Sequence, residues 1–182
     1  PFYLAIRAIQ ENLIHPFIIM TQPSSSIIKD KLKDFDKLFG KAAIFVSSIT
    51  VMLKFYKKFN SKHDISHPII GLFSPINLLK LINEANQKKI NIFQCTRFCL
   101  DEIHERSIET DVLVSILSTE INTLIVQRRN FPLQCLMMSA TPDEKILKCF
   151  GSNVLQIDIP ESQTFPVTEI NQEVEDKEDI NN

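Results

Sequence analysis

Short apolar runs alternate with longer amphipathic segments along most of this 182-residue chain. The short runs predict buried parallel strands, because such strands are covered on both faces and carry few polar residues. The longer segments repeat apolar residues at helical spacing and predict amphipathic helices. The predicted strands are Phe17–Met20, Ala42–Val46, Lys89–Thr96, Phe98–Leu100, Leu133–Met138, Val154–Ile159 and Phe165–Glu169. The predicted helices are Phe2–Asn12, Ser26–Phe39, a segment ending at Phe59, Leu78–Asn86, Glu109–Val126 and a short one opening at residues 142–144. This order predicts an α/β fold with a mostly parallel sheet between helices.

One pair of predicted strands conflicts with this plan, because only Arg97 separates Lys89–Thr96 from Phe98–Leu100. Two parallel strands need a crossover of about a dozen or more residues. Either a segment is missing here or one of the two stretches is not a sheet strand. We favour a missing segment, which would shorten the strand that leads to Asp101 at its amino end.

The main candidate catalytic residues follow the strand Phe98–Leu100, where Asp101 and Glu102 are adjacent in the sequence. In open α/β sheets, ligands bind just outside the carboxyl ends of strands. Neighbouring residues of a strand point to opposite faces, so one carboxylate can face a metal ion and the other a water molecule. His104 lies close enough to act on the same site. A solvated strand end with mixed charges also fits this pair of carboxylates when it is taken alone.

A second strand end supports a more specific interpretation, because Leu133–Met138 is followed by Ser139-Ala140-Thr141. The segment Asp101-Glu-Ile-His-Glu-Arg-Ser with Thr110-Asp111 resembles motif II of the DEAH/DExH-box ATP-dependent helicases of superfamily 2, and Met138-Ser-Ala-Thr resembles their motif III. Phe150-Gly151 and the stretch from Ile159-Pro160 through Phe165-Pro166-Val167 resemble the family's segment closing the first RecA-like domain. The resemblance covers residues 1–170, and residues 171–182 are predicted to form an acidic flexible linker or tail.

The resemblance implies a RecA-like three-layer fold and assigns roles to several side chains. Asp101 would hold Mg²⁺, and Glu102 would orient and deprotonate the water that attacks ATP. His104 would couple the nucleotide site to motif III and to a second RecA-like domain. Ser139 and Thr141 would bind on the cofactor side and link the ATP state to strand movement. Arg106 and Asp111 are expected to form a structural charge pair.

Other segments resemble the family's nucleic-acid motifs and imply RNA or DNA as a partner. Thr21-Gln22-Pro23 resembles motif Ia, and Thr96 resembles the threonine of motif Ib. Ser24 and Ser25 stand where most relatives carry two arginines. Ser24 can hydrogen-bond a phosphate, but it can also cap the helix that follows.

Several parts that ATP hydrolysis needs in this family are absent from the sequence. Its three glycines form no G-x-x-x-x-G-K-[ST] phosphate-binding loop. The residues from Pro1 resemble the segment just after that loop, so we expect a fragment of a longer polypeptide that is inactive by itself. The competing hypothesis is a degenerate helicase remnant that serves as a non-catalytic nucleic-acid or protein binding module. The lost arginine pair, the gap at Arg97 and Pro142 favour that hypothesis. A metallohydrolase built on Asp101, Glu102 and His104 fits poorly, because three ligands within one turn cannot all face one metal.

The bulk composition agrees with one core-bearing domain: 44% of the residues are hydrophobic and 23% are charged. No run of about 18 apolar residues occurs, so no membrane span is expected. The four scattered cysteines are expected to be buried reduced thiols, which indicates an intracellular protein, nuclear or cytoplasmic. The first hundred residues carry 14 Lys and Arg against 6 Asp and Glu, whereas the remainder carries 6 against 16. The basic half could face phosphates or could be solvated helix surface.

Overall fold

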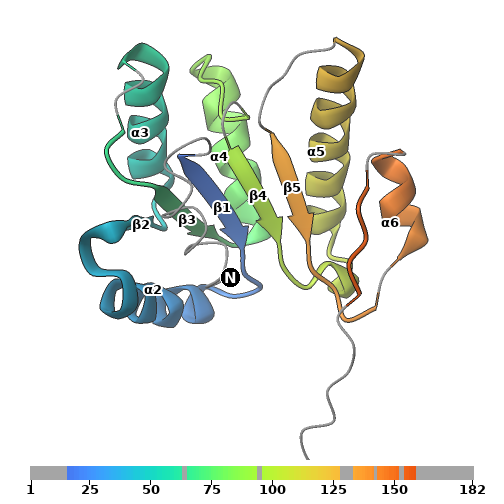
Figure 1. Ribbon diagram of the computed structural model, residues 1–182, viewed down its shortest axis with the longest axis horizontal. Helices are drawn as coiled ribbons and strands as arrows, with labels where there is room; N and C mark the ends of the chain where they lie inside the picture. The colour runs from blue at the N-terminus through green and yellow to red at the C-terminus, as the bar shows by residue number, and fades with distance from the viewer. Residues whose placement is uncertain are drawn as a thin grey trace, which may run out of the picture.

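The computed structural model describes residues 16–62, 65–93, 96–127, 133–141, 143–151 and 154–158. Its centre is a five-stranded sheet in the order β2-β3-β1-β4-β5 (Figure 1), and all four neighbouring pairs are parallel. The strands are β1 Phe17–Thr21, β2 Ile44–Val46, β3 Ile69–Phe73, β4 Thr96–Leu100 and β5 Gln134–Met137. The prediction of an α/β fold with a parallel sheet between helices is confirmed, and the arrangement is consistent with a RecA-like three-layer fold.

Helices cover both faces of this sheet. They are α2 Ser25–Phe39, α3 Ile49–Lys62, α4 Pro75–Gln87, α5 Ile108–Val126 and α6 Glu144–Cys149, with short 3₁₀ turns η1 at Gly40–Ala42 and η2 at Ile103–Glu105. Parallel strands are joined by right-handed crossovers, so the direction in which the chain moves across the sheet decides the face on which each helix lies. The chain moves one way from β1 to β2 and the other way from β2 through β5. This reversal places α2 on one face and α3, α4 and α5 on the opposite face.

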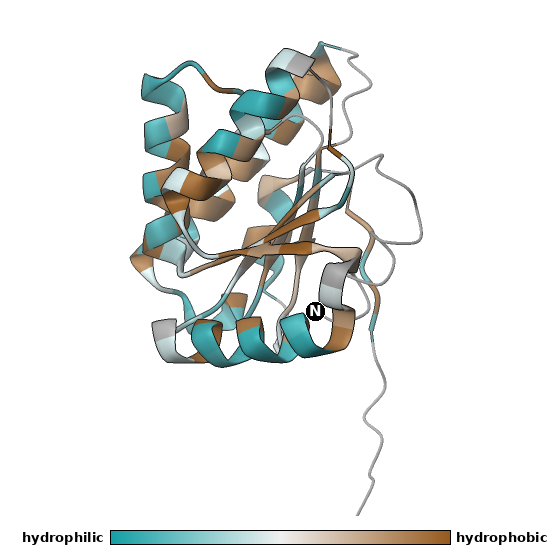
Figure 2. Cartoon of the chain, turned by 90° about the vertical axis from the view of Figure 1, so that its left-hand side faces the viewer, coloured by the Kyte–Doolittle hydropathy of each residue, from teal (hydrophilic) through white to brown (hydrophobic). Residues whose placement is uncertain are grey.

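Two apolar clusters correspond to the two faces. On the α2 side, Ile28 and Phe35 pack with Ile18, Met20 and Cys99, all of them buried. The larger cluster joins the other face of the strands to α3, α4, α5 and α6. Apolar residues concentrate on the strands, while polar residues gather on the outer sides of the helices (Figure 2). The central strand β1 contributes to both clusters, so its position in the fold is strongly specified.

The conflict at Arg97 is resolved by a strand that the sequence analysis did not recognise. Ile69–Phe73 forms β3, which pairs with β1 and with β2, and all five of its residues are buried. Residues 90–93 form no strand, and Thr96 already belongs to β4. The crossover into β4 is therefore α4, which follows β3. The inferred missing segment was wrong, and the strand leading to Asp101 has five residues.

The remaining expectations have mixed outcomes. Residues 154–158 form no strand, and Leu155 and Ile157 are exposed, so that part of the predicted late strand is wrong. The predicted helix in residues 2–12, the strand 165–169 and the acidic segment 171–182 lie outside the described residues. Within the described residues, none of the helices combines the length and apolar character that crossing a bilayer requires.

Candidate functional site at the carboxyl ends of β1, β3 and β4

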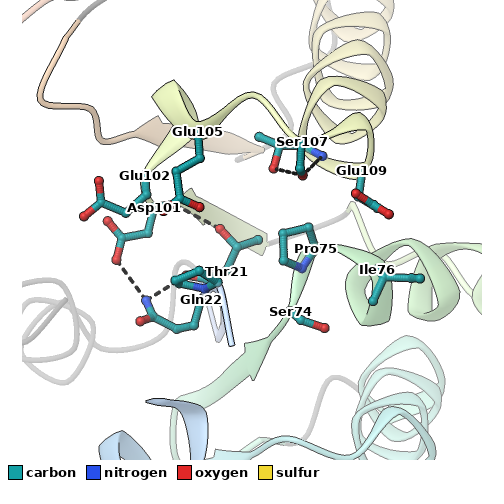
Figure 3. Close-up of a pocket in the computed structure, with 12 residues that line it drawn as sticks. Thr21, Gln22, Ser74, Pro75, Ile76, Asp101, Glu102, Glu105, Ser107 and Glu109 are labelled. Carbon is teal, nitrogen blue, oxygen red and sulfur yellow. Dashed lines mark hydrogen bonds between the residues drawn. The ribbon is translucent and has the colours of Figure 1, made fainter. Parts of the chain in front are cut away.

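A pocket of about 250 Å³ lies where β1, β3 and β4 end (Figure 3). The first turns of α4 and α5 form its other walls. Four carboxylates line it, and among the described residues that line it none is Lys, Arg or His. The acidic lining residues are Asp101, Glu102, Glu105 and Glu109. The pocket therefore favours cations or hydrogen-bond donors over an unaccompanied phosphate.

The Thr21 hydroxyl fixes the backbone at the point where β4 ends. It accepts a hydrogen bond of 2.9 Å from the Asp101 N–H and lies 3.5 Å from the Cys99 carbonyl oxygen. Thr21 is only 3% exposed, so this bond is shielded from water. Because β1 and β4 are neighbours in the sheet, a residue at the end of β1 holds the first residue of the acidic segment in place.

Gln22 holds the side chain of the same aspartate. Its Nε2 donates to the Thr21 carbonyl oxygen at 2.7 Å and to Asp101 Oδ2 at 2.9 Å. Its Oε1 accepts from the Nζ of Lys31 on α2, and Lys31 Nζ lies 3.9 Å from Asp101 Oδ2. Gln22 is 2% exposed. The amide thus connects a cation on α2 to the carboxylate at the end of β4.

The chain turns sharply after Asp101. Glu102 adopts φ 53° and ψ 43°, and Arg106 adopts φ 51°, so left-handed residues stand on both sides of the turn η2. Such a conformation costs a non-glycine residue about 1–2 kcal/mol and persists only where surrounding contacts impose it. The buried Ile103 supplies one of these contacts, because its N–H donates to the Met138 carbonyl oxygen at 3.2 Å.

This turn separates the two adjacent carboxylates. Asp101 points toward Gln22, whereas the side chain of Glu102 extends in a different direction (Figure 3). Glu102 keeps 47% of its side-chain surface exposed, and its Oε2 lies 3.3 Å from His104 Nδ1. Strand alternation predicts that the two acids face different environments, and their environments do differ. The actual cause is the left-handed backbone beyond the end of β4.

Arg106 fastens the other end of the turn. Its Nε and Nη2 donate to the two carboxylate oxygens of Asp111 at 2.8 and 3.0 Å, and its Nη1 donates to Asp143 Oδ2 at 2.6 Å. The hydrogen bonds that Arg106 donates to the Asp111 carboxylate raise the pKa of Arg106 above its ordinary value. The predicted Arg106–Asp111 charge pair is confirmed, and it also includes Asp143, which caps α6.

The end of β5 lies beside the end of β4. The Met138 N–H donates to the Leu100 carbonyl oxygen at 2.9 Å. The Ser139 hydroxyl donates to the Thr141 carbonyl oxygen at 2.6 Å and accepts from the Thr141 N–H at 3.2 Å. Ser139 and Thr141 therefore lie at the same sheet edge as Asp101, but they close their own turn and do not line the pocket.

Thr96 lies at the amino ends of the strands, opposite to the end of the sheet where Asp101 lies. This position corrects its assignment to nucleic-acid binding. It is the first residue of β4 and is 0% exposed. Its hydroxyl donates to the Ile92 carbonyl oxygen at 2.6 Å and shares a hydrogen bond of 2.8 Å with the Tyr56 hydroxyl. A side chain with no exposed surface cannot reach a nucleic acid, so Thr96 has a structural role in the α3 side of the core.

The segment that resembles motif Ia also differs from its expected role. Gln22 is buried against Asp101 instead of facing a strand of nucleic acid, and Thr21 is buried beside it. The Ser24 hydroxyl accepts from the Ile27 N–H at 3.4 Å and caps α2. Of the two possibilities left open for Ser24, the structure contains the cap.

Two contributors to this region were missed in the sequence. Ser74 follows β3, caps α4 and lines the pocket. Its signal was available, because a Ser-Pro pair after an apolar run is typical of a helix start. Lys31 lies among alternating acids and lysines on α2, and nothing local distinguishes it from its neighbours.

A metal ion at this site would need ligands from outside the protein. In the part of the chain that the structure describes, no group of three or more His, Cys, Asp or Glu side chains could hold a metal ion. Mg²⁺ is commonly bound by one or two carboxylates, with water and substrate phosphates as its other ligands. Asp101 fits that pattern. Cys99, two residues before Asp101, is no candidate ligand for Mg²⁺, because its side chain is buried in the apolar cluster on the α2 side and Mg²⁺ prefers oxygen ligands.

No protein family, curated protein or solved structure matched the chain when it was compared with them. A functional proposal therefore depends on the fold and on the geometry of the pocket at the carboxyl ends of the strands.

Proposed function

We propose that this chain is part of the ATP-binding domain of a DEAH-box RNA helicase, which couples ATP hydrolysis to nucleic-acid unwinding. The observation that carries the proposal is the bond between the Asp101 N–H and Thr21 Oγ1, with the Met138-to-Leu100 bond beside it. These bonds bring the segments that resemble motifs Ia, II and III to one edge of a parallel sheet. Ligand sites of open α/β folds are found at that edge.

The two acids divide the work in this proposal. Asp101 lies where a carboxylate can coordinate Mg²⁺ that accompanies the triphosphate. Glu102 is exposed, strained and next to His104, which suits a base that accepts a proton from an attacking water molecule. His104 orients the Glu102 carboxylate, and the Ser139–Thr141 turn lies beside both on the β5 side. Bound Mg·ATP supplies the phosphoanhydride bond that is cleaved.

The same geometry supports the proposal that the isolated 182-residue chain does not hydrolyse ATP. Phosphoryl transfer depends on cations and backbone N–H groups that neutralise and position the phosphates. The pocket lining carries four carboxylates, and the sequence holds no phosphate-binding loop. A complete site would also need a second RecA-like domain, whose arginines contact the nucleotide in this family.

The ATPase proposal is tested on the polypeptide that the whole reading frame encodes, provided that this frame encodes a G-x-x-x-x-G-K-[ST] loop just before residue 1. We expect RNA-stimulated phosphate release that falls by about 100-fold or more in Glu102→Gln, the effect typical of losing a general base. Glu105→Gln, on the same turn, is the matched control and should keep most of the activity. A start codon directly before residue 1, or equal activity of the two variants, would contradict the proposal.

The inactivity of the isolated chain is tested by the same assay, with and without RNA. We expect no release above background. RNA-stimulated turnover that disappears in Glu102→Gln would show that the 182 residues are sufficient.

A second candidate is a non-catalytic binding module derived from a helicase domain. Two observations favour this candidate over an ATPase. The pocket is lined by carboxylates, which repel the phosphates of ATP, and the Ser24 hydroxyl caps α2 instead of being available to a phosphate. Such a module would bind RNA or a protein with the same affinity in the presence and absence of Mg·ATP, and Glu102→Gln would not change that affinity. An affinity that depends on nucleotide would exclude this candidate.

A further inference from the structure

The amide of Gln22 has no spare hydrogen-bonding capacity toward Asp101. Its two Nε2 hydrogens are used by the Thr21 carbonyl and by Asp101 Oδ2, and its oxygen accepts from Lys31. A primary amide has two hydrogens to donate, so both are committed. Because Gln22 is 2% exposed, water cannot easily replace any of these partners. The position of the Lys31 ammonium group therefore fixes which way the buried amide faces.

Lys31 also balances the charge of the carboxylate directly. Its Nζ lies 3.9 Å from Asp101 Oδ2, and the two side chains retain only 31% and 19% of their surfaces exposed. Among the described residues, Lys31 is the one cation that pairs with Asp101. The carboxylates of Glu102 and Glu105 line the same pocket and increase the need for a cation here, while Arg106 at the end of the turn is paired with Asp111 and Asp143.

We propose that Lys31 is a built-in counter-ion of Asp101, which a divalent cation must displace before it can bind there. The proposal rests on the assignment of Asp101 as the metal-binding carboxylate. An ammonium group and a divalent cation placed beside the same carboxylate repel each other, so binding of one weakens binding of the other. Binding of a metal ion at Oδ2 also competes with the hydrogen bond from Gln22 and releases the Lys31–Gln22 link.

The inference is tested by titrating the purified chain with Mn²⁺ and measuring free Mn²⁺ by electron paramagnetic resonance. We expect Lys31→Met to bind Mn²⁺ about five- to tenfold more tightly than the wild type, since the pair is partly shielded from water. The matched control is Lys33→Met, which removes the same charge from an exposed position of α2. It should change the affinity by less than about twofold. Lys31→Arg keeps the charge and should bind no more tightly than the wild type.

Asp101→Asn separates failure of this inference from failure of the site itself. If Mn²⁺ binding is lost in Asp101→Asn but Lys31→Met binds no more tightly than the wild type, the counter-ion role is refuted and the metal site stands. If no variant shows binding that depends on Asp101, both the inference and the metal assignment fail. Binding seen only in Lys31→Met, and lost again when Asp101→Asn is added, supports the inference. Circular dichroism and the urea midpoint identify any variant that does not fold.

The Gln22 side chain gives a second readout. In the wild type, its NH₂ resonances in a nitrogen–proton correlation spectrum should shift as Mg²⁺ is added, because metal binding at Asp101 breaks one of its hydrogen bonds. Unchanged resonances at a Mg²⁺ concentration that saturates Asp101 would refute the coupling.

Discussion

Replacing Thr21 by Val is expected to destabilise the fold and loosen the acidic turn at the same time. The two side chains have almost the same shape, so the change removes one hydroxyl and creates little empty space. The Asp101 N–H then loses its acceptor at 2.9 Å in a place where Thr21 is only 3% exposed. An N–H left without a partner in such a site costs about 1–3 kcal/mol. The bond to the Cys99 carbonyl, at 3.5 Å, adds little.

Urea unfolding measures this cost. A loss of about 1.5 kcal/mol lowers the midpoint by about 0.7 M when the slope is about 2 kcal/mol per molar urea. Thr119→Val is the matched control, because it removes a hydroxyl from an exposed position of α5 and should change stability by less than about 0.5 kcal/mol. Hydrogen exchange supplies the local readout: the Asp101 amide should exchange faster in Thr21→Val but remain protected in Thr21→Ser.

The reasoning is refuted if Thr21→Val unfolds at the wild-type midpoint and keeps the Asp101 amide protected. That result would mean that another acceptor takes over the N–H, and that Thr21 does not hold the turn in place.

Three further predictions concern the backbone and the core. Gly71→Ala should cost about 1–3 kcal/mol in urea unfolding, because its Cβ would lie 2.7 Å from a ring carbon of Phe73; adding Phe73→Leu should recover part of that loss. Glu102→Gly should raise the free energy of unfolding by up to about 1 kcal/mol by relieving a left-handed conformation, whereas Glu105→Gly should lower it; a lower stability in both would show that Glu102 is not strained. Burial raises the pKa of Cys99 from 9.0 to about 12, so the folded state keeps a proton that the unfolded chain loses. Its contribution to stability is complete below pH 9 and is lost as the pH rises toward 12, with a slope of up to about 1.4 kcal/mol per pH unit; Cys99→Ala should show a shallower alkaline decline.

Local signals made much of the fold predictable. The helix that became α2 begins after the capping residue Ser24 and ends at Gly40, which has φ 49°. Both signals act within a few residues, so the sequence contains them fully. The strand end at Asp101 was predictable for the same reason, because an apolar run stops abruptly at charged residues.

The failures have local and tertiary causes. The stretch from Ile69 through Phe73 is a short apolar run that was not recognised as a strand, so the predicted helix after it was not identified as the crossover into β4. Thr96 was assigned to nucleic-acid binding because it resembles the threonine of motif Ib, whereas it is the first residue of β4 and shares a hydrogen bond with Tyr56, 40 residues away. Such pairings depend on which segments become neighbours, and no local pattern encodes that.

In the candidate site, too, features with a local sequence signal were predictable and features that depend on tertiary contacts were not. Asp101 and Glu102 were identified from the sequence, but their separation by a left-handed turn was not, since only glycine and a few other residues signal that conformation locally. Gln22 and Asp101 are 79 residues apart in the sequence, and Lys31 lies on α2. The contacts of these two residues with Asp101 therefore join the ends of β1 and β4 to α2. They become visible only when the ends of β1 and β4 and the side of α2 are placed together.

The two ion pairs of Arg106 affect the stiffness of the loop between β4 and α5. The guanidinium group of Arg106 binds Asp111 in the first turn of α5 and Asp143 at the cap of α6, so neither helix can shift without displacing the loop that precedes α5. These bonds are open to solvent, and dissolved salt weakens attraction between exposed charges. The apolar anchor at Ile103 does not share that sensitivity. The stiffness of the loop that carries Glu102 should therefore decline as ionic strength rises, while the sheet beneath it stays firm.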